Sequence, residues 1–172
     1  MLTAGTGASN AVQLDGSAKL PAVDGSQLTN LPSSYGPVFS AYRSTSDQSI
    51  TSSVWTKVQI QAEEFDPDSF YDSVTNYRFQ PTKSGYYLVT AKVEITASSP
   101  APTLSLVAIY KNGTVFKRSY SSTDIGTSIS ALIYLNGSTD YLEEWAWSNG
   151  GTFPAISFGP EKTFFQASFI RS

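Results

Sequence analysis

The stretch that decides the fold runs from Tyr77 to Ile95 and has the sequence YRFQPTKSGYYLVTAKVEI. Its second half is rich in β-branched and aromatic residues, and Val89, Ala91 and Val93 recur at every second position. Such alternation is typical of a strand that buries one face. Five residues separate Phe79 from Gly85. We therefore predict a short strand over 77–79 and a long strand over 86–95.

Similar runs continue in both directions from this stretch, and no 11-residue window has a helical stripe. Within 54–61, even-numbered residues define one face and odd-numbered residues the other. Asn-Gly pairs at 112 and 136 lie between adjacent strand candidates and predict type I′ hairpins, and a third pair begins at 149. Eight to ten short strands indicate an antiparallel sandwich or jelly roll. The remaining candidate strands are 38–42, 54–60, 103–110, 115–120, 128–135, 141–147 and 163–170.

Composition excludes several classes of function. The 172 residues include 11 basic and 14 acidic ones, giving a net charge of −3, so the basic footprint of a nucleic-acid binder is missing. No run approaches the roughly 18 apolar residues of a membrane span, and we expect neither a membrane nor a nucleic-acid partner. Cysteine and histidine are absent, which removes disulfides, thiolate nucleophiles and imidazole bases. We expect no cofactor.

The first 35 residues differ in composition from the rest. They hold one of the chain's 23 aromatic residues and only three charges, so they cannot bury a core of their own. The sequence Leu-Asp-Gly-Ser at 14–17 is echoed by Val-Asp-Gly-Ser at 23–26. We predict an extended attachment arm over 1–35, with a flexible linker as the alternative. Its partner-binding candidates are Leu14, Leu20, Val23, Leu28 and Leu31.

The order of these patterns resembles a known family. Tyr-Arg-Phe, a five-residue spacer and Gly-Tyr-Tyr over 77–87 resemble the signature of complement C1q-like (tumour-necrosis-factor-like) domains. Residues 38–42 and 163–169 resemble the first and last strands of that family, so the resemblance covers 36–172. Val89 and Ala91 depart from it, because the family usually has aromatic residues there. The resemblance implies an all-β, ten-stranded jelly-roll head and a homotrimer.

Residues 14–31 resemble a segment that recurs in bacteriophage fibre and collar proteins. The two resemblances together predict a non-enzymatic phage protein on the virion surface, bound through its arm to the capsid or another virion protein. The short arm favours a capsid decoration or cement protein, of the head-fibre type. The alternative is the receptor-binding tip of a tail fibre that recognises a host surface glycan. A soluble cellular adhesion or signalling module is a third interpretation.

Carboxylates are the remaining candidates for chemistry. Five of them within 63–72 could bind calcium through hard oxygen ligands, or could form a solvated acidic loop. Glu63, Glu64, Glu143 and Glu144 are the candidates for a glycosidase pair, but nothing in the sequence places two of them across a groove. We therefore assign neither a catalytic nor a metal site.

Aromatic residues are the candidates for contact surfaces. Trp145 and Trp147 share one strand face, where they would either stack on a sugar or be buried in the core or a trimer interface. Loop aromatics at Phe70, Tyr71 and Phe153 could contact a partner or fold back onto the core. The last strand presents Phe165, Ala167 and Phe169 on one face, which would form a trimer interface or fill the monomer core.

Overall fold

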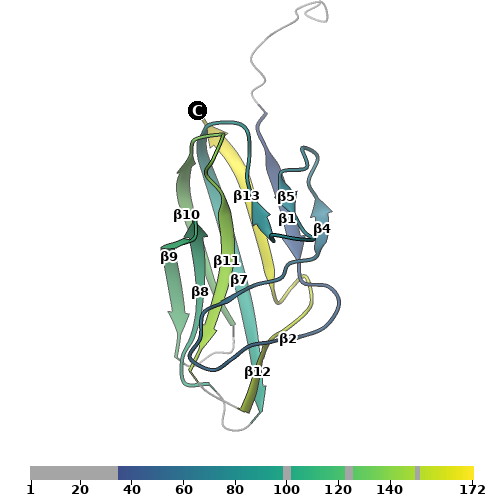
Figure 1. Ribbon diagram of the computed structural model, residues 1–172, viewed down its shortest axis with the longest axis vertical. Coiled ribbons are helices and arrows are strands. Elements are labelled where there is room, and N and C mark those ends of the chain that lie inside the picture. Colours follow the sequence, from purple (N-terminus) through teal and green to yellow (C-terminus); the bar gives the residue numbers. More distant parts are fainter. Residues whose placement is uncertain (1–34, 99–101, 123–125, 150–151) are drawn as a thin grey trace, which may run out of the picture. The chain divides into compact units, whose positions relative to one another are not determined.

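The computed structural model describes residues 35–98, 102–122, 126–149 and 152–172, and these residues form antiparallel strands without a helix (Figure 1). No helix in this part of the chain could cross a membrane. Residues 1–34 of the predicted arm, with its five apolar candidates, lie outside the described residues. The strands are β1 (Val38–Tyr42), β2 (Gln48–Ser49), β3 (Thr56–Lys57), β4 (Ala62–Phe65), β5 (Tyr71–Asp72), β6 (Arg78–Phe79), β7 (Gly85–Ser98), β8 (Ser105–Lys111), β9 (Thr114–Ser121), β10 (Gly126–Leu135), β11 (Leu142–Ser148), β12 (Thr152–Ile156) and β13 (Phe164–Arg171).

Two sheets make up the sandwich. The first has the order β2-β12-β7-β13-β1-β4, with β10 pairing with β7, and the second has the order β5-β6-β11-β8-β9, with β3 pairing with β11. Neighbouring strands in each sheet are mostly distant in sequence, as jelly-roll crossovers require. The prediction of an all-β jelly-roll sandwich is confirmed.

Strand β7 organises the first sheet. Its 14 residues pair with β10 on one side and with β13 and then β12 on the other. The alternation predicted from sequence is present, because Tyr87, Val89, Ala91 and Val93 are buried. Gly85 begins the strand with φ of +149°, and a Cβ there would lie 2.4 Å from the carbonyl oxygen of Arg171. Glycine therefore allows the last strand to approach the start of β7.

The core lies between the two sheets and is largely aromatic at one end. Phe39 stacks on Tyr71 and Phe79, with ring centroids 4.7 and 4.6 Å apart, and meets the edge of Phe165. Aliphatic residues from β7, β8, β10 and β11 fill the rest. Several aromatic contacts of this kind add stability beyond simple area burial.

The strand count differs from the prediction. The described residues contain thirteen strands rather than ten. Four of them, β2, β3, β5 and β6, are two residues long. A strand of two residues is too short to show the alternation of apolar and polar residues from which strands are predicted. Over 54–60 only Thr56–Lys57 pairs as a strand, although Val58 and Ile60 are buried on the predicted face while Val54 is exposed.

One of the two hairpin predictions is wrong. Asn112 and Gly113 both have positive φ and connect the paired strands β8 and β9, as a type I′ turn requires. By contrast, Asn136-Gly137 connects β10 to β11, which belong to different sheets. The side-chain oxygen of Asn136 accepts hydrogen bonds from the backbone amides of residues 138–140, so this pair forms an Asx-type corner.

Candidate functional site

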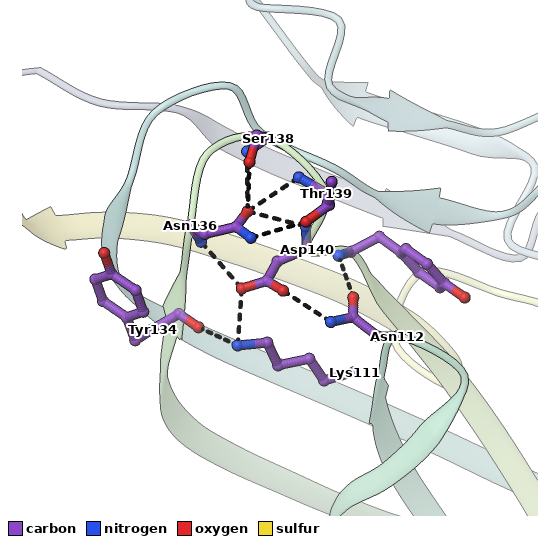
Figure 2. Close-up of polar contacts among 8 residues, drawn as sticks. Lys111, Asn112, Tyr134, Asn136, Ser138, Thr139 and Asp140 are labelled. Atoms are coloured by element: carbon purple, nitrogen blue, oxygen red, sulfur yellow. Dashed lines mark hydrogen bonds and ion pairs between the residues drawn. The ribbon is translucent and has the colours of Figure 1, made fainter.

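A polar network orders the corner between β10 and β11 (Figure 2). Asp140 lies at its centre and accepts hydrogen bonds from the Asn112 side chain at 2.7 Å and the Asn136 backbone amide at 3.0 Å. The Lys111 ammonium lies 2.9 Å from the same carboxylate and donates to the Tyr134 carbonyl oxygen. Because Lys111 belongs to the second sheet and Tyr134 to the first, the cluster holds the two sheets together, and its one carboxylate is already paired.

Gly137 makes the corner possible. Its φ is +70°, and a Cβ would lie 2.5 Å from the backbone nitrogen of Ser84. The corner therefore packs directly against the segment that leads into β7. Through Lys111 and this close approach, the network fixes the end of β10 that carries Tyr134.

Replacing Asp140 with alanine should destabilise the fold by about 2–3 kcal/mol, because it leaves two amide donors without their acceptor and Lys111 without its ion pair. Burial raises the pKa of Asp140, but hydrogen bonds from Asn112, Lys111 and Asn136 outweigh it and lower that pKa overall. The stabilisation is therefore present above the ordinary value of 3.8 and is lost as the pH falls. Urea unfolding at pH 7 and pH 3 measures it.

The matched control is Asp68→Ala, which removes the same charge from an exposed position. We expect its stability to stay within about 0.5 kcal/mol of the parent at both pH values. An Asp140→Ala variant as stable as this control would contradict the structural role assigned to the network.

The carboxylates of the acidic segment 63–72 have separate local roles. Asp72 accepts hydrogen bonds from the backbone amides of residues 74–76. These bonds, the one from Thr75 first, lower the pKa of Asp72 to about 2. Asp66 accepts from the Tyr71 backbone amide, and Glu64 from the Ser40 hydroxyl. In the described part of the chain, no group of three or more acidic side chains converges as a metal site would require.

Glu143 and Glu144 point to opposite faces of β11. Glu143 lies 2.6 Å from the Lys57 ammonium and accepts a hydrogen bond from the Trp145 indole N–H. Glu144 lies in the core, with both carboxyl oxygens unpaired among the described residues. The structure does not bring these two residues together as a catalytic pair, and nothing in the sequence distinguished the buried one.

The tryptophans of β11 lie on the outer face of the second sheet and are half-buried. Trp145 stacks on Tyr110, whereas Trp147 lines an open pocket of about 470 Å³. We call this hollow the aromatic pocket; its lining residues are Trp55, Leu104, Leu106, Arg118, Tyr120 and Trp147. The prediction of loop positions is wrong for Tyr71, which begins β5 and lies in the core, and for Phe153, which lies in β12 and is 84% exposed. Phe70 does lie outside the strands and packs against the core.

The candidate trimer residues of β13 fill the interior of the single chain. Phe165 and Ala167 belong to the core, and Phe169 is partly buried against it and meets the edge of Tyr87. This is the core alternative of the prediction, and side chains covered within one chain leave no surface for another copy. Phe165 and Ala167 therefore fit the core alternative, whereas Phe169 keeps part of its surface exposed.

The opposite, outer face of the first sheet exposes a cluster of large apolar side chains. Leu132 pairs with Leu88 and Tyr134 with Tyr86 across β10 and β7, and the two tyrosine rings meet edge to face. Contiguous apolar surface of this kind marks interaction sites. The outer β7–β10 face, defined here, consists of Tyr86, Leu88, Leu132, Tyr134 and Ile170, all exposed.

Solved structures share this architecture. Murine APRIL superposes with a TM-score of 0.59 at 13% identity, over 78% of this chain and 99% of that one. Eiger TNF from S. frugiperda superposes with a TM-score of 0.59 at 13% identity, over 80% of this chain and 94% of that one. The described chain has the tumour-necrosis-factor-like jelly-roll fold. PRD1 vertex protein P5 superposes with a TM-score of 0.58 at 20% identity, over 80% of this chain and 99% of that one. The sequence matches no protein-family profile and no curated protein.

Proposed function

We propose that the chain is a homotrimeric, non-enzymatic protein of the bacteriophage virion surface, and that it decorates or cements the capsid. The outer β7–β10 face is the observation that carries this proposal. It presents two leucines and two tyrosines in register on neighbouring strands, and none of the described residues covers them. A second and third copy of the chain would bury this face in a closed, symmetric assembly.

Two likenesses support the placement on a phage particle. PRD1 vertex protein P5 is a phage virion protein with the same fold, and residues 14–31 resemble a segment of phage fibre and collar proteins. The charge of −3 and the absence of histidine and cysteine agree with a structural role. Among the carboxylates considered for catalysis, Glu143 is used in an ion pair and Glu144 is in the core.

The mass of the protein in solution and its place on the particle test the proposal together. Light scattering at micromolar concentration should give about 56 kDa, three times the 18.6 kDa of one chain. Imaging of particles should place trimeric density over the capsid shell. A monodisperse monomer would overturn the homotrimer.

Density confined to the tail would instead support the second candidate, the receptor-binding tip of a tail fibre. The aromatic pocket favours this candidate, because aromatic side chains beside an arginine can bind a host glycan. A glycan-binding pocket is also compatible with decoration, so the location on the particle decides between the two roles.

Removing residues 1–34 should abolish attachment and leave the head folded. Residues 35–172 form one compact unit with its own core, so the truncated protein should keep the melting temperature and mass of a trimer. The arm candidates Leu14, Leu20, Val23, Leu28 and Leu31 would bind grooves on the particle, as folding-on-binding segments do. Co-sedimentation with particles measures attachment.

The matched control keeps the arm at full length and replaces those five residues with serine. It should bind particles as poorly as the truncated protein, since three arms on one trimer act by avidity and all three lose their contacts. Full occupancy by either variant would place attachment in the head and contradict the role of the arm.

A further inference from the structure

The outer face of the second sheet contains a pocket whose chemistry is independent of the outer β7–β10 face. Three of its side chains form one row across neighbouring strands, because Trp147 pairs with Leu106 and Leu106 pairs with Tyr120. Cross-strand neighbours on one face lie about 5 Å apart, so the row is continuous from β11 through β8 to β9 (Figure 1). This row forms the floor of the aromatic pocket.

The walls of the pocket come from segments held by named contacts. Trp55 lies beside β3, which pairs with β11, and its ring meets the edge of Tyr110 at 6.0 Å. Leu104 is fixed by two hydrogen bonds with Asn149. The side-chain oxygen of Asn149 accepts from the Leu104 backbone amide at 2.8 Å, and the Asn149 backbone amide donates to the Leu104 carbonyl oxygen at 3.1 Å. The hollow of about 470 Å³ falls within the roughly 300–1,000 Å³ of small-molecule sites.

The charge and donors at the pocket define the ligand. Arg118 lines the pocket and forms no ion pair within the described residues, whereas Lys57, on the same outer face, is paired with Glu143. The indole N–H groups of Trp55 and Trp147 likewise make no hydrogen bond to another described residue, unlike that of Trp145. An unpaired guanidinium favours a carboxylate, and free N–H donors favour hydroxyl groups.

We propose that the aromatic pocket binds an acidic sugar unit of a cell-surface polysaccharide, such as a uronic or sialic acid. The sugar ring would lie on Trp147 and Tyr120, its carboxylate would pair with Arg118, and its hydroxyls would accept from the indole N–H groups. Tyr120 is 69% exposed, so it offers its ring without rearrangement. The site lies within one chain and does not depend on trimerisation or on capsid attachment.

The test uses the full chain and two acidic probes, trigalacturonic acid and 3′-sialyllactose, followed by tryptophan fluorescence. Two of the chain's three tryptophans line the pocket, so binding should change the signal. At least one probe should bind with a Kd of about 1 mM or tighter. Arg118→Ala should weaken it about tenfold, as expected for loss of a charged hydrogen bond. Tyr120→Ala should weaken it as well.

Two controls separate sugar recognition from general charge attraction. Lys117→Ala removes the same charge from the neighbouring residue, which points to the other face of β9, and should leave binding unchanged. Triglutamate and the methyl ester of trigalacturonic acid should not bind. The proposal is overturned if neither acidic sugar binds, if triglutamate or the ester binds equally well, or if Arg118→Ala binds like the parent.

Discussion

Replacing Leu132 with glutamate should convert the protein from about 56 kDa to 18.6 kDa without unfolding it. Leu132 is 63% exposed in the single chain, so a carboxylate there stays hydrated in the monomer. In a trimer built on the outer β7–β10 face, each copy would place that charge against apolar side chains. Desolvating an unpaired charge costs several kcal/mol, and this cost is repeated for every copy. Light scattering at micromolar concentration, with circular dichroism for folding, measures the result.

Two further variants make this result specific. Leu88→Glu alters the register partner of Leu132 on the same face and should also give a monomer. Val74→Glu makes the same chemical change at a position that is 78% exposed and outside that face, and it should remain a trimer. A Leu132→Glu protein that keeps the mass of a trimer would exclude the outer β7–β10 face as the interface.

The sequence predicted the long central strand well because one of its faces is buried and the other is not. Val89, Ala91 and Val93 line the core. Gly85, which precedes them, has a positive φ and lies too close to Arg171 to carry a side chain. The type I′ turn at Asn112-Gly113 was predictable for a similar reason, since positive φ at both positions requires these residue types.

Strand β11 shows where alternation stops being informative. Leu142, Glu144 and Ala146 face the core, while Trp145 and Trp147 are half-buried on the outer face, where Trp145 stacks on Tyr110. A strand covered on both faces has no hydrophobic period that identifies the inner one. Hydrophobicity alone would have placed the tryptophans inside and the glutamate outside.

The sequence could not show which face of β13 belongs to the core, for a related reason. The inner and outer faces of β13 and β10 both carry large apolar side chains, so the sequence predicts apolar surface without saying which face belongs to the core. Phe165 and Ala167 pair with Ala91 and Val89, whose side chains face inward, and this pairing determines the assignment. The register between strands that are distant in sequence cannot be predicted from the local sequence of either strand.

The buried Glu144 should make the protein less stable as the pH rises. Its side chain is 1% exposed, and neither carboxyl oxygen has a hydrogen-bond partner among the described residues. Burial raises the pKa of this carboxyl well above its ordinary value of 4.5. Tyr71 is a neighbouring titratable group, and its own pKa is raised by burial first and by Glu144 second.

The direction of the pH effect follows from proton binding. Below pH 4.5 the carboxyl is neutral in both the folded and the unfolded chain. Above that value the unfolded chain loses the proton while the folded chain keeps it, so the free energy of unfolding falls as the pH rises. A methionine at this position has a similar volume and no charge to desolvate. It should therefore remove this loss of stability.

We expect Glu144→Met to raise the free energy of unfolding by about 1–3 kcal/mol at pH 7, the usual penalty of an unsatisfied buried polar group, and by less at pH 4. Urea unfolding at one fixed protein concentration measures it, because assembly makes apparent stability depend on concentration. Glu143→Gln is the matched control on the other face of the strand. It weakens the ion pair with Lys57 and should lower stability instead. An equal change for Glu144→Met at both pH values would show that the carboxyl does not keep its proton, because only a carboxyl that stays protonated in the folded chain links its burial to pH.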